Sequence, residues 1–258
     1  MSTFLFDQII FGPVWSRRLG ESLGINLMPV NRKLCNFNCI YCECGLSPSD
    51  NRNAILPGSS EVKEKLFYKL QKMKRNGDYL NSITFAGNGE PTLHPEFYTI
   101  IEDTIAIRNK LYPEAQIAVL SNASAIENEI VFNALKKTDL NILKLDSVLE
   151  DTVSLINCPD EHYNFQNIIA QMKRFDGKII IQSMFFRGQF KDKHIDNTTE
   201  PEISAWLEVI KAIKPQSVMI YSIARDTAVK SLQPVSLYEL KNIALRVENE
   251  GISTQITP

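Results

Sequence analysis

Residues 24–30 read Gly24-Ile25-Asn26-Leu27-Met28-Pro29-Val30 and form the first of six short β-rich runs in the chain. Amphipathic stretches with helical spacing of their apolar residues separate these runs. The remaining runs are residues 82–86, 115–120, 141–145, 178–182 and 217–221. Alternating strands and helices favour parallel strands joined by right-handed crossovers. The pattern therefore predicts an α/β fold, built either as a closed or partial barrel or as a doubly wound sheet.

The helices between the strands have recognisable ends. Ser60 stands at a predicted N-cap of the first helix, and Ser236 and Glu239 have the spacing of a capping box that opens the last one. We expect that last helix to stop at Gly251. Three sets of apolar residues at helical spacing mark buried faces: Val62, Leu66, Leu70 and Met73; Ile126, Ile130, Val131 and Ala134; and Ile203, Leu207 and Ile210.

Composition and charge limit the class of protein. The 258 residues are 44% hydrophobic and 22% charged, which is ordinary for a globular chain. The formal net charge of −2 gives no overall attraction to nucleic acid or membrane. No apolar run approaches the roughly 18 residues that span a bilayer, and residues 1–7 lack the pattern of a secretory signal. We therefore expect a cytoplasmic protein without a membrane partner.

The chain is predicted to contain one domain. No linker, low-complexity tract or short-period repeat interrupts the series of strands and helices. We interpret residues 24–258 as this domain, including a C-terminal helix and tail, and residues 1–23 as an N-terminal extension.

Three of the five cysteines lie within the stretch Cys35-Asn36-Phe37-Asn38-Cys39-Ile40-Tyr41-Cys42. An odd number of clustered cysteines does not fit a disulfide framework, whereas three thiolates at this spacing can converge on one soft metal centre. The stretch follows the first predicted strand, and loops at that end of barrel strands carry active sites. Three protein ligands leave one coordination position free for a small molecule. A structural zinc ion with Cys44 or a distant histidine as the fourth ligand is the alternative.

The pattern Cys35-x-x-x-Cys39-x-Tyr41-Cys42 resembles the signature of the radical S-adenosylmethionine (SAM) superfamily. The resemblance implies that the three cysteines hold a 4Fe-4S cluster, whose fourth iron is chelated by the amino and carboxylate groups of SAM. It implies that one electron from the cluster cleaves SAM to methionine and a 5′-deoxyadenosyl radical, which abstracts hydrogen from a substrate. The expected fold is then a partial (β/α)6 TIM-like barrel. The expected partner is a one-electron donor such as a flavodoxin or ferredoxin.

A second motif, Gly87-Asn88-Gly89-Glu90, resembles the Gly-Gly-Glu motif that receives the amino group of SAM in this superfamily. Glycine lets the backbone approach a ligand, and a carboxylate suits an ammonium partner. A turn that leads into the next helix is the alternative explanation. Polar residues at the ends of later strands either contact SAM or substrate or form turns and helix caps. The expected cofactor-binding residues are Tyr41, Gly87, Asn88, Gly89, Glu90, Ser121, Asn122, Asp146, Gln182 and Ser183.

The stretch from Phe11 to Asn26, taken with residues 87–95, resembles the group related to the wyosine tRNA-modifying synthases. This resemblance implies a nucleoside of tRNA or another RNA as the substrate. The chain departs from those synthases because only Cys44 and Cys158 remain for a second cluster, too few for three thiolate ligands. A radical SAM enzyme that modifies a peptide or a small molecule is one alternative. A non-catalytic zinc or iron–sulfur binding module is another.

Basic residues outside the motifs have two explanations each. Arg17 and Arg18 either meet a phosphate or pair with local carboxylates, and Arg225 either binds an anionic substrate group or joins a surface ion pair. Lys33 is a candidate for a Schiff base with a carbonyl substrate. Basic residues of the first helix either touch phosphates or form a solvated face, which is the commoner case; they are Lys63, Lys65, Lys69, Lys72, Lys74 and Arg75.

Overall fold

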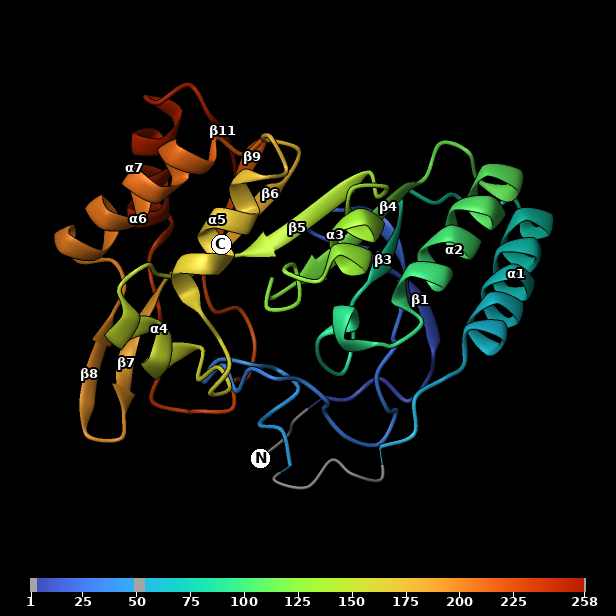
Figure 1. The fold of residues 1–258 in the computed structure, drawn as a ribbon, viewed down its shortest axis with the longest axis horizontal. Coiled ribbons are helices and arrows are strands. Elements are labelled where there is room, and N and C mark those ends of the chain that lie inside the picture. Colours follow the sequence, from blue (N-terminus) through green and yellow to red (C-terminus); the bar gives the residue numbers. More distant parts are fainter. Residues whose placement is uncertain (1–3, 49–53, 258) are drawn as a thin grey trace.

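A sheet of eight strands forms the centre of the computed structural model, which describes residues 4–48 and 54–257 (Figure 1). The strand order is β1-β2-β3-β4-β5-β6-β9-β11. The strands from β2 to β11 are parallel, and β1 at the edge is antiparallel to β2. The bounds are β1 Ile10–Ser16, β2 Gly20–Ile25, β3 Ser82–Phe85, β4 Gln116–Ser121, β5 Leu140–Lys144, β6 Ile180–Met184, β9 Ser217–Tyr221 and β11 Ser253–Thr257. The predicted α/β fold with a partial barrel of parallel strands is confirmed.

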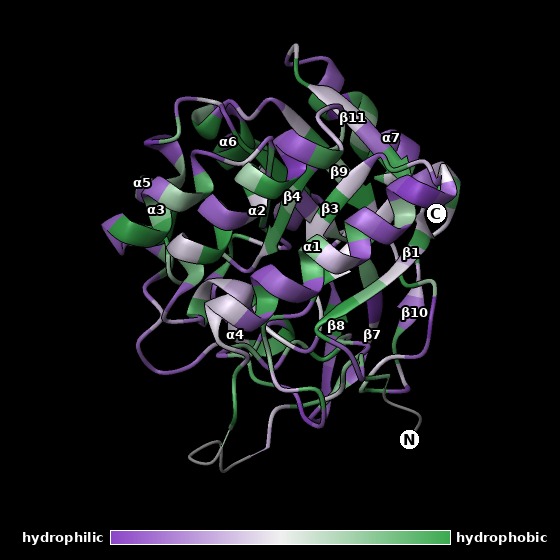
Figure 2. Cartoon of the chain, turned by 90° about the vertical axis from the view of Figure 1, so that its right-hand side faces the viewer, coloured by the Kyte–Doolittle hydropathy of each residue, from purple (hydrophilic) through white to green (hydrophobic). Residues whose placement is uncertain are grey.

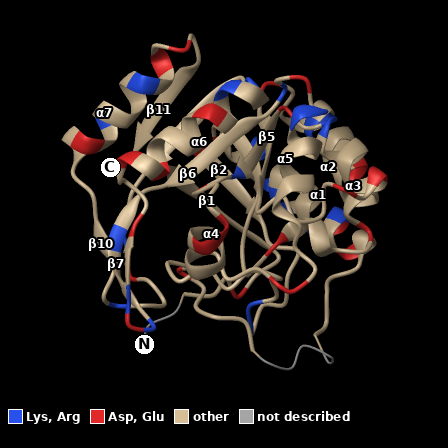
Figure 3. Cartoon of the chain, turned by 60° about the vertical axis from the view of Figure 1, so that its left-hand side comes forward, with Lys and Arg blue, Asp and Glu red and all other residues tan. Residues whose placement is uncertain are grey.

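Helices cover the outer face of this sheet (Figure 1). They are α1 Ser59–Asn76, α2 Phe97–Leu111, α3 Glu129–Leu135, α4 Glu150–Ile156, α5 Phe165–Lys173, α6 Glu200–Ile213 and α7 Leu237–Glu248, with a short 3-10 helix, η1, at Pro91–Leu93. Figure 2 shows hydrophilic and hydrophobic residues alternating along the helices. Figure 3 shows basic and acidic residues mixed over them, as on solvated helix faces. No helix among the described residues is long and apolar enough to cross a membrane.

The beginning of the sheet differs from the prediction. The first parallel strand is Gly20–Ile25, so residues 26–30, which were expected to continue a strand from residue 24, lie outside it. Residues 10–16 and 20–23 of the predicted N-terminal extension form an antiparallel hairpin within the sheet. Residues 1–3 of that extension and residue 258 lie outside the described residues. The other five predicted strands match β3, β4, β5, β6 and β9 to within two residues at each end.

The predicted start of α7 is confirmed, whereas one predicted helix cap and one predicted buried position differ from the structure. Ser236 and Glu239 form the predicted capping box of α7. Helix α1 begins after Gly58, so Ser60 lies in its first turn and is not the N-cap. Ile130 of α3 is exposed, because the helix starts at residue 129 and turns other residues inward. The buried face of α3 consists of Val131, Phe132, Ala134 and Leu135.

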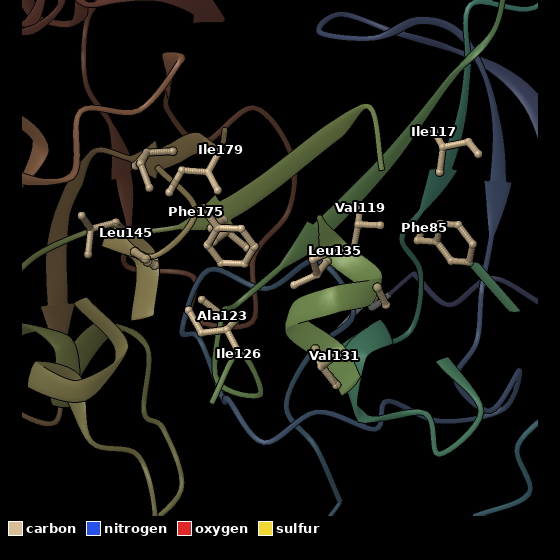
Figure 4. Packing of buried hydrophobic residues seen from close by; sticks show 14 of the residues in the cluster. Phe85, Ile117, Val119, Ala123, Ile126, Val131, Leu135, Leu145, Phe175 and Ile179 are labelled. Atoms are coloured by element: carbon tan, nitrogen blue, oxygen red, sulfur yellow. The ribbon is translucent and has the colours of Figure 1, made fainter. Parts of the chain in front are cut away.

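The strands separate two apolar layers. The larger layer fills the space between the sheet and the helices, and Figure 4 shows Val119, Leu135 and Phe175 within it. The smaller layer lies on the other side of the strands, inside the barrel. It consists of Ala118, Ile142, Ile180 and Met219, with Leu19 packed against them. Successive residues of each strand point to opposite faces, so the two layers take alternate positions.

A second, three-stranded sheet has the order β10-β7-β8 and was not predicted. Its strands are β7 Phe186–Phe190, β8 Lys193–Asp196 and β10 Gln233–Pro234. Phe186 and Ile195 of this sheet pack in one apolar cluster with Phe37 and Tyr41 of the cysteine loop, residues 26–58 between β2 and α1. The small sheet therefore supports the segment that carries the clustered cysteines.

Candidate active site

The cysteine loop crosses the ends of several parallel strands. Leu34 forms a parallel bridge with Gly89, which follows β3. Further along, Ile40 N donates to Ile156 O at 2.9 Å, in the connection that follows β5. The loop therefore lies over the carboxyl ends of the strands, where parallel α/β sheets place their sites.

Two glycines of the second motif allow the cysteine loop to come close. Leu34 N donates to Asn88 O at 2.8 Å, and a Cβ on residue 89 would lie 1.7 Å from Leu34 O. A Cβ on residue 87 would lie 2.4 Å from Asn26 Oδ1. Both glycines have φ near +150°, which side chains rarely adopt. The glycines thus admit the protein's own loop, in addition to any ligand.

Asn88 is fully buried and is bonded to other parts of the chain. Its Nδ2 donates to Phe6 O and to Pro29 O, each at 2.8 Å, and its Oδ1 accepts from Phe6 N at 2.8 Å. The side-chain amide therefore joins the N-terminal segment to the cysteine loop. Of the predicted cofactor-binding residues, Asn88 is one whose polar atoms are already occupied by the protein.

Glu90 connects the ends of β3 and β4. Its Oε1 accepts from Thr92 N at 3.1 Å, Thr92 Oγ1 at 2.6 Å and Ser121 Oγ at 2.9 Å, and its Oε2 accepts from Asn122 N at 2.6 Å. Burial raises the pKa of Glu90, although these hydrogen bonds oppose the shift. The structure thus brings three predicted residues together, Glu90, Ser121 and Asn122, through the carboxylate of the first.

Strand alternation sorts the remaining predicted residues into two groups. Asp146 and Gln182 continue the positions of Ile142 and Ile180, which face the inside of the barrel. Ser183 faces the helices instead. Its Oγ donates to Leu145 O at 2.5 Å and accepts from Trp206 Nε1 at 3.1 Å. Ser147, similarly, donates to Glu202 Oε2 of α6 at 2.6 Å.

A buried polar network connects Tyr41 to β5. The Tyr41 hydroxyl donates to Asp146 Oδ2, and Lys144 Nζ donates to the Tyr41 oxygen at 2.6 Å. Asn157 Nδ2 donates to Asp146 Oδ2 at 2.8 Å and to Cys39 Sγ at 3.6 Å. Burial alone would lower the pKa of Lys144, but Asp146 and other nearby groups raise it well above its usual value. Lys144 was not predicted, although alternation within the fourth predicted strand places it on the same face as Asp146.

The thiols of the three predicted ligands differ in their surroundings. Burial raises the pKa of Cys35 to about 12 and also raises that of Cys39. A hydrogen bond from Cys44 lowers the pKa of Cys42, with help from the charge of Lys33 and against the effect of burial. Within residues 4–48 and 54–257, no three Cys, His, Asp or Glu side chains form a site for a single metal ion. Cys39 nevertheless lies close enough to Cys35 and Cys42 for their charges to affect one another.

A cavity of about 240 Å³ lies inside the barrel, beside Glu43 of the cysteine loop. Its walls come from Thr84, Ala86, Met184 and Tyr221 at strand ends, from Phe11 and Arg18 of the N-terminal hairpin, and from Glu43 of the cysteine loop. Arg225 at its edge forms an exposed ion pair with Glu43 at 2.9 Å, the surface pairing that the sequence left open. A larger hollow of about 800 Å³ lies along α1, and no cysteine is among the lining residues of either cavity.

Comparison with known proteins finds relatives over most of the chain. The model of a family described as the radical SAM superfamily matches residues 33–200. A protein of Brachyspira hyodysenteriae described as GTPase Obg is 30% identical over 219 residues, 85% of this chain but 30% of that protein. A UPF0026 protein of Methanocaldococcus jannaschii is 31% identical over 253 residues, 95% of this chain and 72% of that protein. The chain thus spans less than a third of the first relative.

Solved structures share the fold at low sequence identity. A radical SAM methyltransferase from Sphaerobacter thermophilus has a TM-score of 0.66 and 14% identity, over 92% of this chain and 65% of that one. Streptococcus suis SuiB bound to SAM has a TM-score of 0.62 and 15% identity, over 88% and 49%. An archaeal TYW1 has a TM-score of 0.54 and 13% identity, over 89% and 72%. These similarities concern the partial barrel.

Proposed function

The chain belongs to the radical SAM superfamily, and we propose that Cys35, Cys39 and Cys42 hold a 4Fe-4S cluster with which the enzyme cleaves SAM reductively. When bound, the cluster supplies the electron that breaks a carbon–sulfur bond of SAM, leaving methionine and a 5′-deoxyadenosyl radical that takes hydrogen from the substrate. The residues of this chain hold, orient and shield the reacting groups. The observation that carries the proposal is the position of Cys35 and Cys42 beside one buried cation, with Cys39 close to both of these thiols.

That cation, Lys33, makes the surroundings of the thiols suit a negatively charged group. Lys33 is 3% exposed, and its Nζ donates to Gly45 O at 3.0 Å. No carboxylate among the described residues forms an ion pair with it. A buried ammonium group is costly unless an anion accompanies it, and the Lys33 charge favours the thiolate form of Cys42. Thiolates that carry a metal cluster would provide that counter-charge, since metal ligands bind deprotonated.

Amide donors around the sulfur atoms also suit an iron–sulfur cluster. Asn122 Nδ2 donates to Cys35 Sγ, and Asn157 Nδ2 donates to Cys39 Sγ, each at 3.6 Å. Hydrogen bonds to the ligand sulfurs are among the features by which proteins set cluster potentials. Asn122 directly follows β4, and Asn157 is the C-cap residue of α4, so two different connections of the barrel supply this support.

We assign different tasks to the predicted site residues in this enzyme. Those on the inner side of the strands contact SAM or the substrate: Asn122, Asp146 and Gln182, with the backbone around Gly87 and Gly89. The other predicted residues act as positioning residues: Tyr41, Asn88, Glu90, Ser121 and Ser183. The cavity of about 240 Å³ beside the cysteine loop is the proposed place of reaction.

The leading substrate class in this proposal is a nucleoside of RNA, based on the resemblance of residues 11–26 to the wyosine group. A small molecule is the second candidate, favoured by the limited volume of the cavity. On α1, Lys63 forms an ion pair with Asp103 at 2.7 Å, and Lys65 forms one with Glu61 at 3.1 Å. These pairs reduce the positive charge with which α1 could attract the phosphates of RNA. The proposed electron donor is a flavodoxin or ferredoxin in the cytoplasm.

The proposal is tested on protein loaded with iron and sulfide in the absence of oxygen. Iron, sulfide and zinc are measured, dithionite and SAM are added, and 5′-deoxyadenosine is assayed. We expect about four irons per chain and deoxyadenosine formation. Cys39→Ala should lose both, whereas the matched control Cys158→Ala should keep both. Bound zinc without SAM cleavage would overturn the proposal and favour a non-catalytic binding module.

A further inference from the structure

Arg18 places a guanidinium group inside the barrel. The residue lies in the turn between β1 and β2, and its side chain is half-buried. Its Nη1 donates to Gln182 Oε1 at 3.1 Å, and its Cζ lies 4.7 Å from the centre of the Tyr221 ring. Gln182 and Tyr221 occupy inner positions of β6 and β9, continuing those of Ile180 and Met219. A cation from the edge hairpin thus reaches the opposite strands of the barrel.

The turn that carries Arg18 is held from two sides. Ser16 Oγ accepts from Arg18 N at 3.3 Å and from Leu19 N at 3.1 Å. From the far edge of the sheet, Gln255 Nε2 of β11 donates to Arg18 O at 3.3 Å. The backbone of Arg18 is therefore positioned before any ligand arrives, which lowers the entropic cost of binding.

The partners of Arg18 differ from those of the arginines that form ion pairs. Five arginines form ion pairs with carboxylates: Arg108, Arg174, Arg187, Arg225 and Arg246. Among the described residues, Arg18 instead meets a neutral amide and an aromatic ring. The guanidinium group has five N–H donors and stays charged in proteins. A carboxylate or phosphate is the partner that suits its fork of donors.

We propose that Arg18 binds an oxyanion of the substrate, a carboxylate or a phosphate, in the cavity of about 240 Å³. This inference rests on the proposed function, because it names the substrate class of the same site. Glu43 at the cavity edge already pairs with Arg225, so it does not neutralise Arg18. Phe11 and Trp15 line the same cavity and offer apolar surface to the rest of the substrate.

The test is a calorimetric titration of the cluster-loaded protein with two probes, inorganic phosphate and acetate, in the absence of oxygen. We expect wild-type protein to bind at least one probe and Arg18→Gln to bind it about tenfold more weakly. Arg18→Lys keeps the charge but loses the fork, and should bind about threefold more weakly. Arg174→Gln removes an equal charge from an exposed ion pair and should bind as wild type does. Circular dichroism and iron content check that each variant is folded.

The outcomes show which kind of substrate group Arg18 binds. Preference for phosphate supports a phosphate ester as substrate, and preference for acetate supports a carboxylic acid. The proposal is overturned if neither probe binds to wild-type protein, or if Arg18→Gln binds as Arg174→Gln does. A tenfold loss of SAM affinity in Arg18→Gln would assign the anion to the SAM carboxylate and also overturn it. These titrations need no SAM cleavage, so they stand or fall separately from the iron and deoxyadenosine assays.

Discussion

The carbonyl oxygen of Leu34 lies so close to Gly89 that a Cβ built on residue 89 would be 1.7 Å from it. Two hydrogen bonds hold this approach in register: Leu34 N donates to Asn88 O at 2.8 Å, and Glu90 N donates to Leu34 O at 3.2 Å. Leu34 precedes the first clustered cysteine, and Glu90 binds the end of β4. The contact therefore couples the position of the cysteine loop to the strand ends beneath it.

Gly89→Ala should displace the cysteine loop. The added methyl group has no space against backbone, and the residue also has a φ of +150°. We expect a loss of about 2–4 kcal/mol in the free energy of unfolding and a lower iron content after reconstitution. Chemical denaturation and iron analysis measure the two effects. Gly58→Ala is the control, because a Cβ added at residue 58 would have no atom within 4 Å. If Gly89→Ala is as stable as the wild-type protein, the close contact between Leu34 O and residue 89 is contradicted.

Ser183→Ala should leave SAM affinity unchanged. The Ser183 hydroxyl faces α6, where Trp206 Nε1 also donates to Leu145 O at 3.0 Å and so keeps a partner. We expect a stability loss of about 1 kcal/mol from the missing hydrogen bond. Binding of SAM to the cluster-loaded protein, measured by calorimetry, checks the first expectation. Gln182→Ala, on the inner face, is the comparison. A marked loss of SAM affinity in Ser183→Ala would show that the hydroxyl turns toward the ligand.

Lys144→Met should destabilise the protein strongly. Its ammonium group is 3.5 Å from Asp146 Oδ2 and 2.6 Å from the Tyr41 oxygen, and it is mostly buried. Removing one partner of a buried ion pair leaves an uncompensated charge, which costs about 3–5 kcal/mol. The double variant Lys144→Met, Asp146→Asn should lose less than the single variant, as measured by urea denaturation. If the stability loss in the double variant equals the sum of the losses in the two single variants, the coupling between Lys144 and Asp146 is ruled out.

Glu239 should make stability depend on pH in the acid range. Hydrogen bonds from Arg187 and from Ser236 lower the pKa of Glu239 from 4.5 to about 2. A lowered carboxyl pKa in the folded state adds stability above the unfolded value, and this stability is lost as the pH falls through the folded value. Because the side chain is 34% exposed, screening limits the effect to about 1 kcal/mol or less.

The variant Glu239→Gln isolates this effect. At pH 7 we expect it to unfold at a lower urea concentration than wild-type protein. The difference between the two should shrink as the pH falls from about 4.5 to about 2, where the wild-type carboxyl also becomes neutral. A difference that stays constant over this range would mean that Glu239 acts through packing rather than charge.

Local patterns in the sequence were enough to predict the framework of the sheet. The run at residues 217–221 became β9 with the same bounds, because a short apolar run between turn signals suits a buried parallel strand. Alternation within such runs also predicts toward which face of the sheet each polar side chain points. It separates Gln182 from Ser183, although the two were predicted together as cofactor contacts. The hairpin of β1 was missed, because its half-exposed residues have little periodicity.

The sequence by itself determined the order of strands and helices, the cysteine spacing and the glycine motif, because each depends on residues that are neighbours in the chain. Only the tertiary structure decided which distant groups meet. Arg18 and Gln182 are 164 positions apart, and Tyr41 and Asp146 are 105 apart. Packing the helices on the sheet buries polar groups, and a buried polar group needs a hydrogen-bond partner. In the folded protein that partner comes from a segment that is distant in the sequence. Local sequence patterns do not predict which of these distant polar groups become partners.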